Sequence, residues 1–373
     1  MLSRGTTTED RLHCTETQLN KGKSSPSARR VRAVVPNRVD LAGGTLDIYP
    51  LYLLVPGSMT VNAAIGVRSE VEIVTAGYGA RLHSENFDLS IKARDTHAFP
   101  TGGKLGLIAS ALRFFPPVKG VELRFRNEAP MGSGIGASSS LLVAAMLAMY
   151  SFLGKRRGWE ETARAAMEIE AEHLRCLTGR QDHLAALRGG IQGIRFLPGR
   201  IDSERIGAGS VSGRKLAAHG FLASSGKAHR SADVNWRMVR GAIEGNEVIL
   251  RRFRGIASVA REAWDAVLAG DAAEAGRAVA REWKIRKTLA AGVSSPKVDR
   301  LFASREFRMR VVGAKLCGAG GGGMVFGMLR SPGDRKRVDA ILAAEGFTVY
   351  PFRISGGPRV ETESAGSRRG PEP

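Results

Sequence analysis

A run of glycines and serines near the middle of the chain has the residue types of an anion-binding loop. Residues 130–140 read PMGSGIGASSS. Alternating apolar and polar residues predict a strand over 121–126, and the apolar stretch 141–153 predicts a buried helix. Glycines allow the tight turn that exposes backbone N–H groups, and the helix start adds a positive dipole end. The segment therefore predicts a phosphate site, with serine hydroxyls to cap the helix, contact phosphate or bind Mg²⁺.

Two common phosphate-binding patterns describe this loop less well. A P-loop ends in Gly-Lys-Ser or Gly-Lys-Thr, and the loop contains no lysine. The dinucleotide fingerprint is matched in letters by Gly132, Gly134 and Ala137, but no acidic residue ends a clear second strand. A glycine turn with a serine helix cap and no ligand is the simplest alternative.

Charged residues in the segment 36–48 lie among apolar residues and glycines. They are Arg38, Asp40 and Asp47. A charge in such a setting needs a partner or a ligand. The alternative is an exposed turn in which Asp47 caps a helix.

Two further acidic residues follow the loop. Glu170 lies in an Ala- and Glu-rich helix predicted over 160–177, where an exposed glutamate is the ordinary interpretation. Asp182 follows a turn at Thr178-Gly179 and opens an apolar helix, where it would ordinarily be a helix cap. A second glycine run, residues 320–323, lies tightly between two apolar strands, which favours a ligand-closing segment over a flexible loop.

The elements needed to position these residues alternate between strands and helices, which predicts an α+β protein. We expect a turn near Arg68, a loop over 206–214 and, because of Pro351, an edge position for the last strand. The predicted strands are 31–35, 59–67, 70–75, 121–126, 191–196, 217–224, 311–316, 324–329 and 348–354, with a hairpin within 81–91. The predicted helices are 105–115, 141–153, 160–177, 235–255, 257–268, 272–289, 296–303 and 334–345.

Composition limits the classes of protein to consider. The formal net charge is +20, yet the arginines are scattered and no basic run alternates with aromatics, so nucleic-acid binding is not favoured. A surface that attracts phosphorylated small molecules explains the charge equally well. Three distant cysteines form no disulfide or zinc pattern, and a reducing cytoplasm is expected. No apolar run of about 18 residues predicts a membrane span, and no apolar signal-peptide core begins the chain.

Three glycine-bearing segments, taken together and in this order, resemble the three motifs of the GHMP kinases, the family of galactokinases, homoserine kinases, mevalonate kinases and phosphomevalonate kinases. They are residues 36–47, 130–140 and 315–323, and the resemblance covers the chain from about Val31 to Arg359. The Gly179-Arg180-Gln181-Asp182 turn and the four-glycine third motif are most similar to the sugar-kinase branch. That branch includes heptose 7-phosphate kinases and fucokinase-like and arabinokinase-like enzymes.

The resemblance implies a two-domain α+β fold. Its N-terminal domain, residues 31–205, would be ribosomal-protein-S5-like, and its C-terminal domain, residues 206–360, would be ferredoxin-like. Residues 1–30 and 361–373 are expected to be disordered, because their polar composition lacks periodicity. A homodimer is compatible with the sequence.

The resemblance also implies phosphoryl transfer from ATP to a hydroxyl of a sugar or sugar phosphate. Asp182 would orient the hydroxyl and accept its proton, Arg38 would keep Asp182 ionised, and Ser138 with Glu170 would hold Mg²⁺. The residues implied in ATP binding are Pro130, Gly132, Ser133, Gly134, Ile135, Gly136, Ala137, Ser138 and Ser139. The residues implied in acceptor binding are Asp47, Gly43, Gly44, Thr45, Gly320 and Gly321.

Two departures from the family pattern bear on the substrate and the metal. Gly44 and Thr45 replace the Glu-His pair of galactokinases, which argues against galactose and predicts room beside the acceptor for a larger substituent or a phosphate. Ala137 stands where a first serine is usual, which leaves Ser138 as the metal-binding serine. The alternatives are a kinase of a non-sugar alcohol such as mevalonate or homoserine, a non-catalytic sugar or nucleotide sensor, and a basic RNA-binding protein.

Deletion of residues 1–25 is expected to leave the melting temperature and activity nearly unchanged. The segment's composition cannot bury enough apolar surface to order itself on the body of the protein. Thermal unfolding and turnover of the full chain and the shortened chain provide the measurement. A clear loss of either property in the shortened chain would show that the segment docks.

Overall fold

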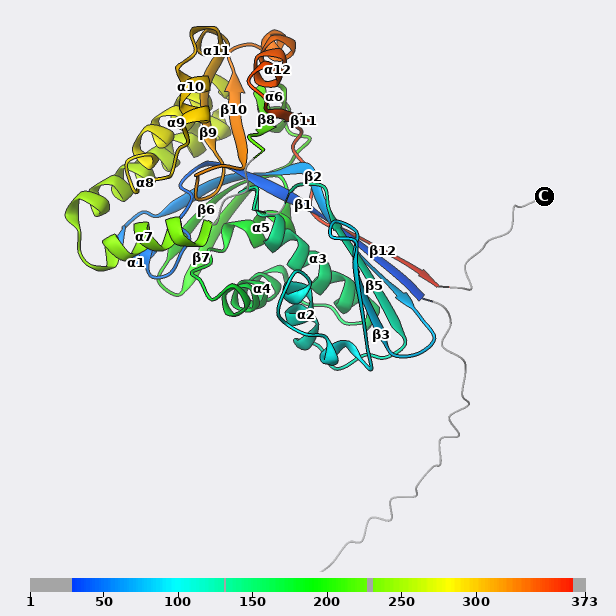
Figure 1. The fold of residues 1–373 in the computed structure, drawn as a ribbon. Coiled ribbons are helices and arrows are strands. Elements are labelled where there is room, and N and C mark those ends of the chain that lie inside the picture. The colour runs from blue at the N-terminus through cyan, green and yellow to red at the C-terminus, as the bar shows by residue number, and fades with distance from the viewer. Residues whose placement is uncertain (1–28, 131, 227–230, 365–373) are drawn as a thin grey trace, which may run out of the picture.

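Two β-sheets and the helices packed on them make up the structure (Figure 1). This computed structural model describes residues 29–130, 132–226 and 231–364. The first sheet has eight strands in the order β12-β1-β2-β5-β3-β4, with β6 paired to β2 and β7 to β6. Its pairs are antiparallel except β3 with β5. Its strands are β1 (Arg29–Ala42), β2 (Met59–Thr75), β3 (Ala80–Ser84), β4 (Leu89–Ala93), β5 (Val121–Asn127), β6 (Ile191–Leu197), β7 (Arg200–Ile206) and β12 (Arg359–Ser364).

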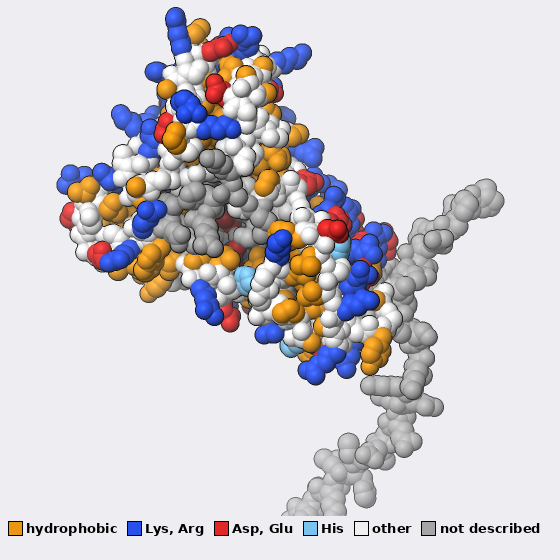
Figure 2. Space-filling model, viewed as in Figure 1, with side chains coloured by type: hydrophobic (Ala, Val, Ile, Leu, Met, Phe, Trp, Pro, Cys, Tyr) orange, Lys and Arg blue, Asp and Glu red, His pale blue; other side chains and the backbone are white. Residues whose placement is uncertain are grey.

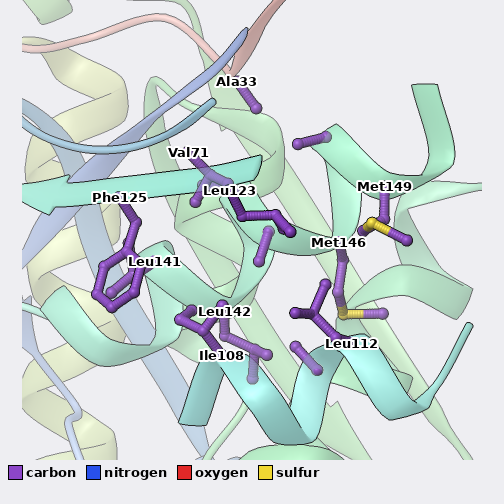
Figure 3. Packing of buried hydrophobic residues seen from close by; sticks show 14 of the residues in the cluster. Ala33, Val71, Ile108, Leu112, Leu123, Phe125, Leu141, Leu142, Met146 and Met149 are labelled. Atoms are coloured by element: carbon purple, nitrogen blue, oxygen red, sulfur yellow. The ribbon is translucent and has the colours of Figure 1, made fainter. Parts of the chain in front are cut away.

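Helices cover one face of the first sheet because its inward residues are apolar. The helices are α2 (Gly106–Arg113), α3 (Ala137–Phe152), α4 (Trp159–Leu174) and α5 (Gln181–Arg188). Figure 3 shows α3 between the sheet and α2, with Leu142 and Met146 facing Leu123 of β5 and Ile108 of α2. Since α3 is buried on nearly all sides, it lacks the polar face of a surface helix. This packing fixes the helix that follows the glycine loop.

The second sheet is smaller and antiparallel, in the order β11-β8-β10-β9. Figure 1 shows it at the top of the molecule, with its helices around it. Its strands are β8 (Gly220–Ser224), β9 (Val311–Leu316), β10 (Met324–Leu329) and β11 (Thr348–Tyr350). The surrounding helices are α6 (Val211–His219), α9 (Ala272–Arg286), α10 (Pro296–Ala303), α11 (Arg305–Arg310) and α12 (Arg335–Ala344).

The long helix α8 (Glu247–Ala269) packs against α9 and also against β1 and β2, so it contacts both parts of the fold. Helix α7 (Ser231–Ile243) precedes it and packs on the short helix α1 (Leu51–Leu54). Two 3₁₀ turns complete the described elements, η1 (Thr96–Ala98) and η2 (Pro332–Asp334).

The predicted pair of strands around Arg68 was wrong, because β2 runs without a turn from Met59 to Thr75. The register of β2 against β1 shifts near Gly66, which forms a bulge in place of a turn. The Gly66 N–H donates to the carbonyl of Arg353, 3.0 Å away, so the bulge is anchored by another segment. The sequence pattern correctly predicted an irregularity at this point, but it predicted a turn where the structure has a bulge.

Several predicted boundaries also moved. The break between α7 and α8 falls before Asn246, whose side chain accepts hydrogen bonds from two backbone N–H groups of α8 and caps it. The loop predicted over 206–214 ends at Ser210, which caps α6. The last strand of the second sheet ends at Tyr350 ahead of Pro351, and its predicted edge position is confirmed.

The prediction of a disordered tail from residue 361 was wrong for residues 361–364. They belong to β12, which pairs with β1 from Arg29↔Ser364 to Val34↔Arg359 and returns the chain to the first sheet. Residues 1–28 and 365–373 lie outside the described part of the chain. The domain boundaries 31–205 and 206–360 stay a prediction.

On the face of the molecule shown in Figure 2, Lys and Arg side chains are spread over the upper part and along the edge near β12, without one dominant patch. Many of the described arginines pair with acidic neighbours, as Arg32 does with Glu70 at 2.5 Å. Within the described residues, no helix combines the length and apolar character that a membrane crossing requires.

Candidate functional site

The glycine loop that joins β5 to α3 needs its glycines for two physical reasons. Gly132, Gly134 and Gly136 have φ values of 73°, 79° and 72°, in the left-handed region that side chains disfavour. Space is also limiting, because a Cβ atom on Gly134 would lie 2.5 Å from the carbonyl oxygen of Cys317. A Cβ atom on Gly136 would lie 3.1 Å from a carboxylate oxygen of Asp182. The loop is therefore shaped by its contacts with two distant segments.

The second glycine run packs on the first. A Cβ atom on Gly323 would lie 2.5 Å from the carbonyl oxygen of Ser133, and that oxygen accepts a 2.8 Å hydrogen bond from the N–H of Met324. Gly320 and Gly321 instead meet Val293, whose carbonyl accepts a 2.7 Å hydrogen bond from the N–H of Gly321. The run thus connects the loop before α3 to the second sheet.

A buried polar cluster holds the start of α3 to the sheet. The hydroxyl of Ser140 on α3 lies 2.6 Å from that of Ser69 on β2. The side chain of Ser69 also contacts Asn37 on β1 and Asn127 on β5, each at 3.0 Å. Asn127 in turn donates to the carbonyl of Ala137 at 2.8 Å. These bonds fix the helix N-terminus beneath the glycine loop.

Arg38 and Asp182 form the ion pair at the centre of the site. The guanidinium of Arg38 on β1 donates from Nε to Asp182 Oδ1 at 2.7 Å and from Nη1 to the carbonyl of Gly134 at 2.6 Å. Burial opposes the charge of Arg38, but the carboxylates of Asp182 and Asp40 outweigh it and raise the arginine pKa. The Asp182 side chain is 22% exposed against 5% for Arg38, so the carboxylate is the partner that reaches open space.

Asp47 holds the turn that carries Asp182. Its Oδ2 accepts a 3.0 Å hydrogen bond from the backbone N–H of Gln181 at the start of α5. Gly179 is required here, because a Cβ atom on it would lie 1.9 Å from the same Asp47 oxygen. Burial, together with the charge of Asp182, raises the pKa of Asp47 to about 6, although the Gln181 N–H opposes the shift.

Glu170 of α4 is buried, contrary to the ordinary interpretation of a helical glutamate. Its two carboxylate oxygens accept hydrogen bonds from Ser138 Oγ at 2.7 Å and Ser139 Oγ at 2.8 Å. His183 Nε2, also buried, lies 3.1 Å from Oε2 outside hydrogen-bond geometry. Burial would raise the pKa of Glu170, but His183 and the serine hydroxyls hold it below its usual value. The carboxylate is therefore ionised beside the serines.

One cavity of about 600 Å³ brings these groups together. It is lined by most of the residues to which the sequence analysis gave a role and by Asp40, which that analysis noted only as a charge in need of a partner or ligand. The other lining residues are Ile48, Leu174, Cys176, Leu177, Thr178, Gly179, Gln181, Asn235, Gly318 and Ala319. The selected residues that line it are Arg38, Gly44, Thr45, Asp47, Gly132, Ser133, Gly134, Gly136, Ala137, Ser138, Ser139, Glu170 and Asp182. The selected residues absent from its lining are Gly43, Pro130, Ile135, Gly320 and Gly321. At the end near the second sheet, Gly318 and Ala319 face the cavity instead of Gly320 and Gly321.

Comparison with known proteins places these segments in a family. Residues 105–190 match the model of the GHMP kinases N terminal domain, and residues 263–347 match the model of the GHMP kinases C terminal domain. Both domains of the GHMP kinases are present in this chain. The N-terminal match contains the glycine loop, Glu170 and Asp182, and the C-terminal match contains the second glycine run. The two-domain fold expected from the sequence is thereby confirmed.

Relatives of this chain include kinases named for sugars and for mevalonate. It is 25% identical to the D-glycero-alpha-D-manno-heptose 7-phosphate kinase of Campylobacter jejuni over 80% of this chain and 89% of that protein. It is 24% identical to the bifunctional fucokinase/GDP-fucose pyrophosphorylase of Arabidopsis thaliana over 79% of this chain, which spans only 29% of that protein. It is 26% identical to the mevalonate kinase of Aeropyrum pernix over 86% of this chain and 96% of that one.

A solved structure confirms the fold independently of the sequence motifs. The D-glycero-D-manno-heptose 1-phosphate kinase of Bacteroides thetaiotaomicron superposes with a TM-score of 0.71, at 23% identity, over 89% of this chain and 98% of that one. At this identity the likeness speaks to the fold alone.

Although Gly44 lines the cavity, a side chain at this position would not start in open space. A Cβ atom on Gly44 would lie 2.8 Å from Asp40 Oδ2 and 3.1 Å from Nη2 of Arg286. The volume that a glutamate side chain would need is thus filled by a buried carboxylate and a buried guanidinium. Glycine at this position makes room for an internal ion pair network instead of for a substrate substituent.

The sequence analysis did not identify three charged residues that support the site. Lys315 on β9 and Glu282 and Arg286 on α9 are fully buried. A usable signal existed for two of them, because Glu282 and Arg286 are four residues apart and share one helix face. Lys315 lies in a strand whose neighbours are apolar, where a lysine needs a partner. Only the fold shows which partners these residues have.

The donors present fit a hard divalent cation. A hydroxyl and an ionised carboxylate, Ser138 and Glu170, lie within hydrogen-bonding distance at the cavity wall, and oxygen ligands suit Mg²⁺. Among the described residues, no group of three or more His, Cys, Asp or Glu side chains could hold a metal ion by itself. A small number of protein ligands is typical of Mg²⁺ sites that share the ion with phosphates.

The raised pKa of Asp47 predicts a pH-dependent difference in stability between the native chain and Asp47→Asn. The folded state binds the Asp47 proton more tightly than the unfolded chain, whose aspartates titrate near pH 4. The stabilising contribution is therefore present below pH 4 and is lost as the pH rises through about 6.

Relative to the native chain, Asp47→Asn should gain on the order of 2 kcal/mol in free energy of unfolding between pH 4.5 and pH 7.5. Urea unfolding of both proteins at the two pH values measures this gain. A difference that does not change with pH would contradict the shifted pKa.

Proposed function

We propose that this protein is an ATP-dependent kinase that transfers the γ-phosphoryl group to a hydroxyl of a sugar or sugar phosphate. The observation that carries the proposal is the pairing of Arg38 with Asp182 directly against the glycine loop, in the same cavity as Ser138 and Glu170. Phosphoryl transfer needs phosphate-binding donors, a metal site and a group that positions the nucleophile within reach of one another. The glycine loop, the Ser138 and Glu170 oxygens and the Asp182 carboxylate match these three requirements, which supports the proposal.

The glycine loop and the start of α3 would bind the triphosphate. The left-handed glycines leave backbone N–H groups free of side-chain cover, and the N-terminus of a long helix favours negative charge. Ser138 and Glu170 would hold Mg²⁺, which neutralises charge on the transferring group when bound. Ser133 and Ser139 add hydroxyl groups at the cavity wall.

Asp182 would orient the acceptor hydroxyl and accept its proton. Its carboxylate is partly exposed to the cavity and is held in place by the Arg38 guanidinium beside it. In the loose transition states of phosphoryl transfer the proton leaves late, so positioning is a large part of this role. Arg38 also donates a 2.6 Å hydrogen bond to the carbonyl of Gly134, so it fixes the position of Asp182 relative to the glycine loop.

The acceptor class follows from the neighbours of Asp182 and from the relatives. The turn that follows β1 contributes Gly44, Thr45 and Asp47 to the cavity lining. Asp47 Oδ1 has only a 3.4 Å contact with the Gln181 side chain, so it can still accept a hydrogen bond from a sugar hydroxyl. The heptose 7-phosphate kinase and the fucokinase-containing relative act on sugars, which favours a sugar over mevalonate. A non-catalytic sensor is disfavoured because Asp182, Glu170 and Asp47 are all retained.

An ADP-release screen tests the proposed reaction. The panel contains free hexoses, heptoses, their phosphates, mevalonate and homoserine, each with ATP and Mg²⁺. We expect the highest kcat/KM for a sugar or a sugar phosphate. A higher value for mevalonate or homoserine would overturn the acceptor class. Absence of ADP release, combined with no thermal shift from ATP and Mg²⁺, would overturn the kinase assignment.

Asp182→Asn should reduce turnover by at least about a hundredfold while ATP binding persists, because the amide cannot accept the hydroxyl proton but has nearly the same shape. Turnover with the best acceptor and ATP binding by calorimetry are the measurements. Asp202→Asn, at a half-exposed surface ion pair with Arg200, is the matched control and should behave like the native protein. Near-native kcat in Asp182→Asn would remove Asp182 from the catalytic assignment.

Ser138→Ala and Glu170→Gln should each raise the Mg²⁺ concentration needed for half-maximal activity, since each removes one of few protein oxygens available to the ion. Activity is titrated against Mg²⁺ at saturating ATP. Ser151→Ala, near the other end of α3, is the control. Titration curves identical to that of the native protein for both variants would place the metal elsewhere.

A further inference from the structure

A chain of ion pairs runs through the interior of the protein from α9 to the catalytic carboxylate. Every member except Asp182 is at most 4% exposed. Three members are basic and three are acidic, so the charges balance. In order, they are Arg286, Glu282, Lys315, Asp40, Arg38 and Asp182.

The links are close in the part contributed by the second sheet and its helix. Arg286 Nε donates to Glu282 Oε1 at 2.6 Å. Lys315 Nζ lies 3.0 Å from Glu282 Oε2 and 2.5 Å from Asp40 Oδ2. Asp40 then lies 3.9 Å from Arg38, which binds Asp182 at 2.6 Å. The ends of this chain are therefore coupled across both parts of the fold.

The remaining N–H groups of Arg286 donate hydrogen bonds to the turn that follows β1. Its Nη2 donates to the carbonyl of Gly44, and its Nη1 donates to Thr45 Oγ1 at 3.2 Å. A guanidinium can serve Glu282 and both of these acceptors because its N–H groups form a rigid planar fork. Arg286 is itself fully buried and absent from the cavity lining, so it does not touch a ligand there.

The backbone that Arg286 holds is conformationally strained. Thr45 has φ 78°, a value that is costly for a β-branched residue. Such conformations persist where surrounding contacts over-determine them. The turn is closed by backbone bonds from Leu46 N–H to Gly43 and from Ile48 N–H to Thr45, both 3.1 Å. Arg286 adds one bond at the strained residue itself, to Thr45 Oγ1, and one at the residue before it, to the carbonyl of Gly44.

The strained turn sets the position of Asp47, two residues after Thr45. Asp47 binds the N–H of Gln181, the residue before Asp182. Arg286 is thus connected to Asp182 indirectly in two ways, through the chain of ion pairs and through this turn. Both routes begin on α9, which belongs to the C-terminal family domain.

We propose that Arg286 is a positioning residue that fixes the acceptor-binding turn, residues 43–48, from the C-terminal domain. The kinetic part of this proposal rests on the proposed function, whereas the ordering of the turn does not. A lysine at position 286 keeps the charge opposite Glu282 but provides a single nitrogen in place of the fork, so it loses the Gly44 and Thr45 contacts.

The test compares the native protein with Arg286→Lys and with the control Arg281→Lys. Arg281 lies on the same helix, and its ion pairs with Glu262 and Glu274 are at the surface. The first readout is amide hydrogen exchange at Leu46 and Ile48, which needs no substrate. The second is the separate measurement of KM for the acceptor, KM for ATP and kcat.

We expect Arg286→Lys to exchange faster at both amides and to raise KM for the acceptor about tenfold, with KM for ATP nearly unchanged. Arg281→Lys should match the native protein. Unchanged exchange at the two amides, or an equal rise in both KM values, would overturn the positioning role. If the native protein itself turns over no acceptor, faster exchange in Arg286→Lys would still support the positioning role, while the proposed function would be overturned.

A second variant keeps the test decisive if Arg286→Lys does not fold. Thr45→Val preserves the β-branched shape and the buried ion pairs but removes the hydroxyl that accepts from Arg286. It should speed exchange at Leu46 and Ile48 in the same direction by a smaller factor. Native exchange rates in a folded Thr45→Val protein would overturn the role of this contact.

Discussion

The cost of burying charge is the constraint on which the rest of the site depends. Arg38 enters the interior on β1, where an unpaired guanidinium would be strongly unfavourable, and two carboxylates offset that cost. One of them, Asp182, must then lie at the start of α5 and against the glycine loop. The other, Asp40, must itself be neutralised by Lys315 of the second sheet. Satisfying one charge therefore determines the relative placement of two sheets.

Close approach of backbones is the second requirement, and it explains the glycines. The backbones of the loop before α3 and of the run before β10 meet at distances that exclude a Cβ atom, and the turn before α5 lies equally close to the Asp47 side chain. Such contacts bring N–H groups, hydroxyls and carboxylates into one cavity without intervening side chains. Helix α3 supplies the rigid base, because its buried apolar surface and the cluster around Ser69 and Ser140 fix its first turn. The arrangement suits a reaction in which positioning and charge neutralisation do most of the catalysis.

We infer that these buried ion pairs contribute to specificity of arrangement more than to stability. Replacing one member leaves its partner charged and unpaired, at a cost of about 3–5 kcal/mol. The chain of pairs from Arg286 to Asp182 thus penalises any arrangement that separates α9 from β1. The strained Thr45 is tolerated for the same reason, since its surroundings leave it no alternative. The turn that follows β1 is in this way held by a residue of α9.

The sequence by itself determined the local features of this protein. Glycine spacing predicted an anion-binding loop, apolar spacing predicted α2, an apolar stretch predicted α3, and the charge of Arg38 among apolar residues marked a residue that lines the cavity. Glu170 and Asp182, which line the same cavity, were selected by the family resemblance. Family resemblance gave the two-domain fold. These features were predictable because each depends on the conformational preferences of a short segment.

Tertiary structure alone decided the features that depend on distant neighbours. Thr45 and Arg286 are 241 residues apart, and their contact has no local signature. The volume beside Gly44 looked open in the sequence but is filled by Asp40 and Arg286. Strand β12 forms because β1 offers an unpaired edge, although its own composition predicts disorder. In each case packing across the chain, which local propensity does not encode, supplied the free energy that fixed the outcome.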